Sequence, residues 1–185
     1  MDKIKKEKNW QLLKSERAID LNIVKIRHDY YKNPRNEKTV KVIAIEGHNA
    51  ANVIAKTKEG KIILVRQFRF GIADYTLEIP GGIIDEGEET LIAAQREVKE
   101  ETGYVGKNWQ YLGNVLSNPV WMDTTIHHYY MDNAELKHEL DLDEAEDVEI
   151  ILLTPEEVYQ KIENGDIKHP HTISAFYFAR KILGF

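Results

Sequence analysis

Several carboxylates lie close together in the middle of the chain. Glu97 is followed by Glu100 and Glu101, three and four residues later, and Arg96 precedes the group. Residues at these intervals lie on one face of an α-helix, so the three carboxylates should project together. Like charges at this spacing are mildly unfavourable, which indicates either a solvated acidic face or a site for a cation. Oxygen ligands of this kind suit Mg²⁺ or Mn²⁺.

The segment 85–103 has the features of a helix that would hold these carboxylates. Asp85 stands three residues before Glu88, which is the spacing of an N-terminal capping box. Gly103 can take the left-handed conformation that ends a helix. Apolar residues recur at positions that would form one buried stripe: Leu91, Ala94 and Val98. We therefore expect one helix that begins near Asp85 and ends at Gly103.

Two glycines, Gly81 and Gly82, come just before this helix, after the short apolar segment 77–79. Glycine lets the backbone approach a ligand closely, and an exposed carbonyl oxygen here would be a further hard ligand for a metal ion. The sequence therefore predicts a loop in which the Gly81 carbonyl can complete a metal site.

Two arginines follow the apolar run 62–65, which predicts a central strand. Arg66 and Arg69 lie at the end of this strand, shortly before the glycine turn. They could bind a phosphate group, or they could be surface cations paired with Asp74 or Glu78. The residues alone leave both alternatives open.

The whole chain has the composition of a globular protein. It has 185 residues, of which 42% are hydrophobic and 30% are charged, and a formal net charge of -6. This length predicts a single domain over residues 11–185, preceded by a mobile mixed-charge tail at residues 1–10. The acidic balance argues against a general nucleic-acid-binding protein.

The absence of cysteine excludes disulfides, thiolate nucleophiles and cysteine-ligated zinc. The lysine-rich start of the chain is not followed by an apolar run, and no window reaches the length of a membrane span. We therefore expect a cytoplasmic protein that binds neither a membrane nor nucleic acid.

Hydrophobic patterning predicts an α/β fold. Turn residues separate the early strand-like runs at hairpin spacing, which predicts an N-terminal antiparallel β meander. Strands are expected at 21–31, 39–46, 52–58, 61–68, 109–115, 125–131 and 148–153. Thr154 opens a capping box for one C-terminal helix, and a last helix begins at His171. Together these elements fit an α/β/α sandwich around a mixed sheet.

The segment 82–104 resembles the signature of the Nudix hydrolases. The matching residues are Gly82, then Glu88, then Arg96-Glu97-Val98, then Glu100-Glu101, then Gly103, each at the spacing of the signature. Tyr104 stands where the family usually has an aliphatic residue, which affects packing at the helix end and not a ligand. The resemblance favours a metal site over a merely solvated acidic face.

Outside the signature, the chain resembles the branch of ADP-ribose pyrophosphatases and nucleoside-diphosphate-sugar hydrolases. Several segments carry this resemblance, among them Val65-Arg66-Gln67-Phe68-Arg69, the strand and loop 77–82, and the acidic segment 144–149. The resemblance implies metal-dependent hydrolysis of the diphosphate linkage of a nucleotide sugar. The substrate expected first is ADP-ribose, which would be split into AMP and ribose 5-phosphate.

The resemblance also implies roles for the residues of the helix expected over 85–103 and of the glycine loop before it. Glu97 and Glu101 would be the main ligands of Mg²⁺, or of Mn²⁺, with Glu100 as a shared ligand and the Gly81 carbonyl as one more. Arg96 would hold the geometry of these ligands by pairing with Glu88 or Glu100. The general base for the attacking water would come from the acidic segment, where Glu144 aligns best and Glu146 is close behind.

Substrate contacts are implied for residues of the strands. Arg66 and Arg69 would clamp the diphosphate, and Glu78 would bind a ribose hydroxyl. In this branch a second subunit often lends residues of an N-terminal strand, which for this chain would be Arg27 or Tyr30. A homodimer is therefore expected.

Three alternatives to ADP-ribose hydrolysis remain. Trp121 and its neighbours depart from the pattern of the branch, and Trp121 could stack on a base or simply pack. The substrate could then be GDP-mannose or a broader set of nucleoside-diphosphate sugars. The chain could also be a Nudix-fold module that binds nucleotides without turnover, although the intact Arg96, Glu97, Glu100 and Glu101 speak against it.

Overall fold

The structure is a computed structural model that describes residues 9–21, 23–142, 144 and 146–185. The chain divides into two compact units, one formed by residues 1–48 and 116–124 and the other by residues 49–115 and 125–185. The expectation of a single domain over 11–185 stays a prediction. Most of the predicted tail lies outside the described residues, and its last two residues, Asn9 and Trp10, are exposed.

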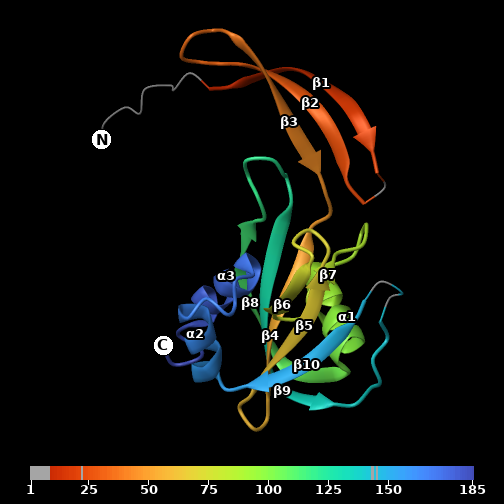
Figure 1. Cartoon of the computed structure of the whole chain (residues 1–185), viewed down its shortest axis with the longest axis vertical. Coiled ribbons are helices and arrows are strands. Elements are labelled where there is room, and N and C mark those ends of the chain that lie inside the picture. The colour runs from red at the N-terminus through yellow and green to blue at the C-terminus, as the bar shows by residue number, and fades with distance from the viewer. Residues whose placement is uncertain (1–8, 22, 143, 145) are drawn as a thin grey trace. The chain divides into compact units, whose positions relative to one another are not determined.

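The smaller unit is an antiparallel β meander, as predicted (Figure 1). Its strands are β1 (Gln11–Asp20), β2 (Lys25–Lys32) and β3 (Thr39–Glu46), with β2 in the middle. Strand β1 was not predicted, because almost all of its residues are exposed and its sequence lacks the apolar alternation of a half-buried strand. Strand β2 begins at Lys25, later than the predicted start at residue 21.

The larger unit contains a mixed seven-stranded sheet. The central strand β4 runs parallel to β9 and antiparallel to β5, and β5 in turn is antiparallel to β10. Two short strands extend the sheet, since β6 pairs with β5 and β7 pairs with β4. The strands are β4 (Ala50–Thr57), β5 (Ile62–Arg69), β6 (Asp74–Glu78), β7 (Gly81–Ile83), β8 (Tyr104–Leu116), β9 (Thr125–Leu136) and β10 (Val148–Leu153).

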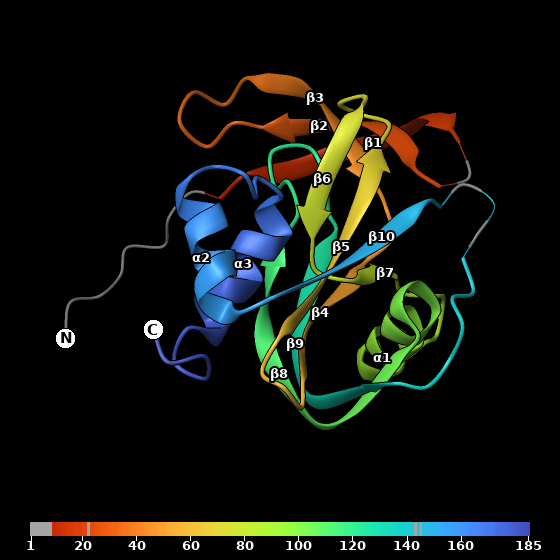
Figure 2. The ribbon, with the colours of Figure 1, turned by 60° about the horizontal axis from the view of Figure 1, so that its bottom comes forward.

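Helices cover both faces of this sheet (Figure 2). On one face, α1 (Thr90–Thr102) packs Ala94 and Val98 against alternate residues of β4 such as Val53. On the other face, α2 (Pro155–Glu163) and α3 (Pro170–Ala179) cover the intervening residues such as Ile54. This three-layer arrangement confirms the predicted α/β/α sandwich. None of the described helices is long and apolar enough to cross a membrane.

The start of α1 differs from the prediction. The helix begins at Thr90, and its N-cap Glu89 makes no side-chain capping bond. The Asp85 backbone N–H does donate to Glu88 Oε2 at 3.1 Å, but this bond orders the turn that precedes the helix. Gly87 has a φ of 81°, which interrupts helical geometry between the two acids. The predicted end of α1 is confirmed, since its C-cap Gly103 is left-handed with φ 71°.

Candidate active site

The larger unit contains a cavity of about 660 Å³ that is bordered by the end of β5, by β7, by α1 and by the loop before β10. Six carboxylates and two guanidinium groups line it, so its charge is strongly negative. The lining residues are Gln67, Arg69, Gly81, Gly82, Ile83, Asp85, Arg96, Glu97, Glu100, Glu101, Asp141, Leu142 and Glu146. A phosphate-bearing ligand could enter such a cavity only together with cations.

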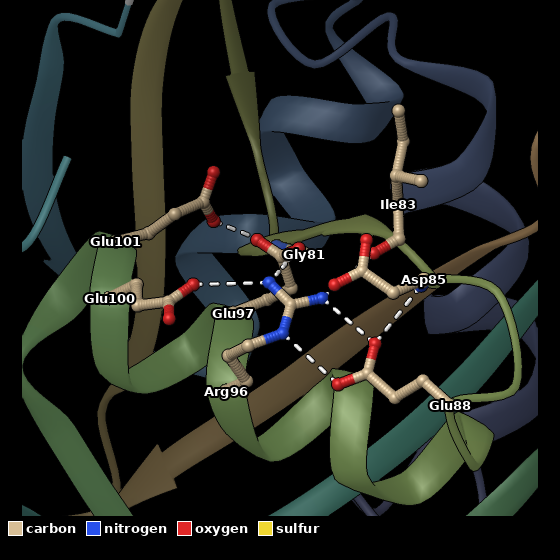
Figure 3. Close-up of polar contacts among 8 residues, drawn as sticks. All are labelled: Gly81, Ile83, Asp85, Glu88, Arg96, Glu97, Glu100 and Glu101. Carbon is tan, nitrogen blue, oxygen red and sulfur yellow. Dashed lines mark hydrogen bonds and ion pairs between the residues drawn. The ribbon is translucent and has the colours of Figure 1, made fainter. Parts of the chain in front are cut away.

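Arg96 is bonded on all sides to three carboxylates and one backbone carbonyl (Figure 3). Its Nε and Nη2 donate to the two oxygens of Glu88, both at 3.0 Å. Its Nη1 donates to Glu97 at 2.7 Å and to Glu100 at 3.1 Å, and Nη2 also donates to the Ile83 carbonyl at 2.9 Å. A guanidinium group has five N–H donors, and these five bonds use them all. Arg96 therefore pairs with both of the partners that the sequence left as alternatives.

Glu97 and Glu101 are buried carboxylates, with 9% and 3% of their surface exposed. Burial raises the pKa of Glu101 to about 8, and the charges of Glu97 and Glu146 add to the rise, although the Gly81 N–H donates to Glu101 at 2.8 Å and opposes it. Burial is also the largest cause of the raised pKa of Glu97. These shifts arise mainly because both carboxylates are buried, and a bound cation would favour their ionised forms.

The donor chemistry of the cluster suits a hard divalent cation, because all of its side-chain donors are carboxylate oxygens. Across the described part of the chain, no three acidic or histidine side chains are already arranged so that they could hold a metal ion. Arg96 Nη1 binds one oxygen of Glu97 and one oxygen of Glu100. The other oxygens of these two carboxylates, together with Glu101 and the Gly81 carbonyl, could hold a metal ion.

Gly81 occupies a backbone position that only glycine fits. Its φ is 149°, and a β-carbon at this position would lie 2.2 Å from the Ala51 carbonyl oxygen. The close approach arises because β7 pairs with β4, with Gly81 opposite Asn52. This pairing brings the Gly81 N–H to Glu101, so the glycine loop lies against α1. The role of the Gly81 carbonyl as a metal ligand stays a prediction.

The two arginines of β5, Arg66 and Arg69, have different surroundings in the structure. Arg69 lines the cavity, and its Nε and Nη2 donate to the buried carboxylate of Glu78 at 2.7 and 2.6 Å. Arg66 does not line the cavity. Its Nη1 lies 3.2 Å from Glu149, and its guanidinium lies 4.0 Å from the centre of the Tyr75 ring. Only Arg69 is therefore placed to meet a ligand in the cavity.

The acidic segment contributes one of its two predicted residues. Glu146 lines the cavity, and its charge acts on both Glu97 and Glu101. Glu144 is exposed and is not among the lining residues. The preceding loop is tied to the end of α1, because Asp141 N–H donates to the Glu100 carbonyl at 3.0 Å. This backbone bond fixes the position of the loop relative to the C-terminal end of α1.

Some lining residues were not predicted from the sequence. Gln67 lies two positions before Arg69 on β5, so the alternation of a strand places both side chains on the same face. That periodicity would have been sufficient to find Gln67. Asp141 and Leu142 reach the cavity through the path of an irregular loop, for which the sequence has no periodic signal.

The remaining predicted residues belong to the smaller unit. Arg27 forms ion pairs within that unit, to Asp29 at 3.0 Å, Glu46 at 2.6 Å and Asp123 at 3.2 Å. The Tyr30 ring lies 5.9 and 5.7 Å from the amino groups of Lys14 and Lys41. Trp121, also in this unit, is 49% exposed. Substrate contacts by Arg27 and Tyr30 stay predictions.

The α/β/α sandwich and the carboxylates of α1, arranged behind a glycine loop, define the class of Nudix-fold proteins. A family model described as the NUDIX domain matches residues 47–176. Because this match covers more than half of the chain, the chain belongs to the Nudix family. Hydrolases of this family generally use a divalent metal ion.

Similar proteins include two bacterial ones that match most of the chain. The methanol dehydrogenase activator of Bacillus methanolicus is 33% identical over 179 residues, which are 96% of this chain and 95% of that protein. The ADP-ribose pyrophosphatase of Bacillus subtilis is 33% identical over 144 residues, 77% of this chain and 78% of that protein.

A mammalian relative matches a shorter part of the chain. The ADP-sugar pyrophosphatase of Mus musculus is 35% identical over 114 residues, which are 56% of this chain and 52% of that protein. The crystal structure of an ADP compounds hydrolase has the same fold, with a TM-score of 0.86, 20% sequence identity, and coverage of 97% of this chain and 96% of that one. The predicted family, its pyrophosphatase branch and the enzyme class are confirmed.

Proposed function

We propose that this protein hydrolyses the diphosphate linkage of ADP-ribose and releases AMP and ribose 5-phosphate. The observation that carries the proposal is one cavity in which Arg69 meets the carboxylates Glu97, Glu101 and Glu146. A diphosphate needs a cation and a metal site beside it, and hydrolysis needs a base for water. The ADP-ribose and ADP-sugar pyrophosphatases among the relatives support this substrate class.

We assign the metal site to Glu97, Glu100, Glu101 and the Gly81 carbonyl, with Mg²⁺ as the ion and Mn²⁺ as a substitute. When bound, such an ion neutralises the diphosphate and stabilises the charge that develops on its oxygens. Arg96 orients Glu97 and Glu100, and Arg69 donates a hydrogen bond to a phosphate oxygen. The cavity volume of about 660 Å³ lies within the range of about 300–1,000 Å³ that is usual for small-molecule sites.

We assign the general base to Glu146 in preference to Glu144, because Glu146 lines the cavity. The carboxylate takes a proton from water while the water oxygen forms a bond to one phosphorus. The bond from this phosphorus to the bridging oxygen breaks, and the other phosphate leaves with that oxygen. Two phosphate monoesters result, so the atoms and charges balance.

The test is a product assay on purified protein. ADP-ribose, GDP-mannose, other nucleoside-diphosphate sugars and dinucleotides are each incubated with Mg²⁺ or Mn²⁺, and monophosphate products are separated by chromatography. The proposal expects ADP-ribose to have the highest kcat/KM. A higher kcat/KM for GDP-mannose, or similar kcat/KM values for all nucleoside-diphosphate sugars, would support the alternative substrates in place of ADP-ribose. Binding of these compounds without any product would indicate a non-catalytic module.

We also propose an oligomeric state and a cellular location for the enzyme. A cytoplasmic homodimer would let Arg27 or Tyr30 of one subunit complete the substrate site of the other. Light scattering in solution, combined with kcat/KM for Arg27→Ala and Tyr30→Phe, tests this assignment. A monomeric mass together with full activity would contradict it.

A second candidate function is supported by the relative from Bacillus methanolicus, whose name is that of a methanol dehydrogenase activator and which matches 96% of this chain. We propose as a test that the protein be added to a purified methanol dehydrogenase and the oxidation rate followed. A rate increase that the Glu146→Gln variant fails to produce would support an activating role that depends on hydrolysis. No change in rate would leave sugar-nucleotide hydrolysis as the function.

A further inference from the structure

The side chain of Arg69 is paired with the buried carboxylate of Glu78. Its Nε and Nη2 donate to the two oxygens of Glu78 at 2.7 and 2.6 Å, which is a bidentate ion pair. Only 1% of the Glu78 side chain is exposed, against 42% of the Arg69 side chain. Within the described residues, Nη1 of Arg69 has no hydrogen bond. Arg69 is therefore anchored on one edge, and its Nη1 is left to donate to a ligand in the cavity.

Glu78 is itself fixed by further groups. The Thr76 hydroxyl donates to Oε1, and His169 Nδ1 lies 3.3 Å from Oε2. Burial alone would raise the pKa of Glu78, but the bonds from Arg69 and Thr76 and the charges of His169 and Arg69 outweigh it and lower this pKa. Glu78 is thus an ionised group that cannot turn toward solvent, which makes it a rigid anchor.

Other carboxylates compete for Arg69. Glu101 and Glu146 line the same cavity, and after Glu78 their charges contribute to the raised pKa of the Arg69 guanidinium. Arg96 shows what a guanidinium does in this cavity, since its Nη1 bridges Glu97 and Glu100. An Arg69 without its anchor could pair with Glu101 or Glu146 in the same way. It would then occupy oxygens that a metal ion needs.

We propose that Glu78 is a positioning residue that holds Arg69 away from the acidic cluster, so that the metal ion and the substrate each keep their own partners. This inference builds on the proposed function, because it gives Arg69 to the diphosphate and Glu101 to the metal. It assigns to Glu78 a role through Arg69 in place of the direct ribose contact predicted from the sequence.

The chain contains a matched control for this pair on the same strand. Arg66 forms an ion pair with Glu149 at 3.2 Å, but both side chains are exposed, at 44% and 63%. Glu149 lies opposite Arg66 in the register of β10 and β5, whereas Glu78 lies on β6, on the other side of β5. Removal of the Glu149 charge therefore changes an arginine–glutamate pair of β5 without affecting the cavity.

The experiment measures Mn²⁺ binding, in the absence of substrate, by the paramagnetic resonance signal of free Mn²⁺. Four proteins are compared: wild type, Glu78→Gln, Glu78→Gln with Arg69→Gln, and Glu149→Gln. We expect Glu78→Gln to weaken Mn²⁺ binding by about tenfold, a usual size for loss of a group that supports metal ligands. The double variant should return to within about threefold of wild type, because it lacks the competing cation, and Glu149→Gln should equal wild type.

Two results would overturn the proposal. Wild-type Mn²⁺ affinity in Glu78→Gln would show that Arg69 does not compete with the metal. Weak binding that persists in the double variant would show that Glu78 acts on the fold of the site and not through Arg69. If Glu78→Gln does not fold, Thr76→Val tests the same point more mildly. It should weaken Mn²⁺ binding by about two- to threefold, and adding Arg69→Gln should again reverse the loss.

The outcome is separable from that of the proposed function. Mn²⁺ affinity is measured without a nucleotide, so the comparison holds even if wild-type protein does not hydrolyse ADP-ribose. Failure of wild type to release AMP would reject the substrate assignment alone. Equal Mn²⁺ affinities of wild type and Glu78→Gln, together with normal ADP-ribose hydrolysis by wild type, would reject the positioning role alone.

Discussion

A β-carbon on Gly82 would lie 2.5 Å from the carboxyl carbon of Glu97 and at 2.5 and 2.6 Å from its two oxygens. The carboxylate of Glu97 thus packs directly on the glycine loop, and any side chain at position 82 would displace it. The backbone of Gly82 is not in the left-handed region, so glycine is required at position 82 because of the Glu97 carboxylate and not because of φ.

Gly82→Ala should therefore impair the metal site. The added methyl group must push Glu97 away, and we expect the metal concentration for half-maximal activity to rise by about tenfold or more. Activity is measured as a function of Mg²⁺ concentration with the assay of the proposed function. Gly71→Ala is the control, because nothing lies within 4 Å of a β-carbon at that position. An unchanged Mg²⁺ dependence in Gly82→Ala would contradict the ligand role of Glu97.

The two acids of the loop before β10 should differ in their effect on turnover. Glu146→Gln removes the proposed base, and we expect kcat to fall by about 100-fold or more, as loss of a general base usually does. Mn²⁺ binding should change far less. Glu144→Gln is the matched control and should keep nearly full kcat, since Glu144 does not line the cavity. The reverse order of the two variants would return the base to Glu144.

Metal binding should depend on pH through Glu101. Without a metal ion the pKa of this carboxyl is about 8, because it is buried. Below pH 8 a metal ion must displace its proton, so the apparent Mn²⁺ affinity should increase as the pH rises from about 6.5 to 8 and then level off. Titration calorimetry in two buffers of different ionisation enthalpy measures the released proton. Glu101→Gln should bind Mn²⁺ weakly and release fewer protons. Equal proton release from both proteins would exclude Glu101 as the source.

The sequence was most informative where a site depends on local spacing. The face shared by Glu97 and Glu101 follows from helix geometry, and the turn at Gly103 follows from its own conformational freedom. The same kind of reasoning placed the helix start too early, because Asp85 and Glu88 have capping-box spacing on either side of a left-handed Gly87. Spacing alone does not report the backbone conformation between two residues.

Choices that depend on tertiary contacts could not be made from the sequence. Arg66 and Arg69 have the same chemistry and lie on the same strand, but Glu149 and Glu78 approach them from different neighbouring strands. Which acid of the segment 144–149 reaches the cavity depends on the path of a loop that is tied to α1 by backbone bonds. Neither feature leaves a periodic pattern in the chain.

Buried histidine should make the protein less stable in acid. His128 is fully buried, and its Nε2 lies 2.9 Å from the Ser174 hydroxyl oxygen. Burial lowers its pKa to about 4, and the neighbouring histidines 171, 127 and 169 add to the effect. In the unfolded chain a histidine titrates near 6.5, so between pH 6.5 and pH 4 the unfolded state binds a proton that the folded state does not. The free energy of unfolding should therefore fall with falling pH in this window, by up to about 1.4 kcal/mol per pH unit from His128.

Urea unfolding of wild type and of His128→Gln, each at pH 7 and pH 5, measures this contribution. Other groups, among them Glu78 with its lowered pKa, also cost stability in acid, but they are common to both proteins and cancel in the difference. The variant should be less stable at pH 7 and should lose less stability on acidification. The exposed His48→Gln provides the control and should follow wild type. If wild type and His128→Gln lose equal stability between the two pH values, His128 is not the group that takes up the proton on unfolding.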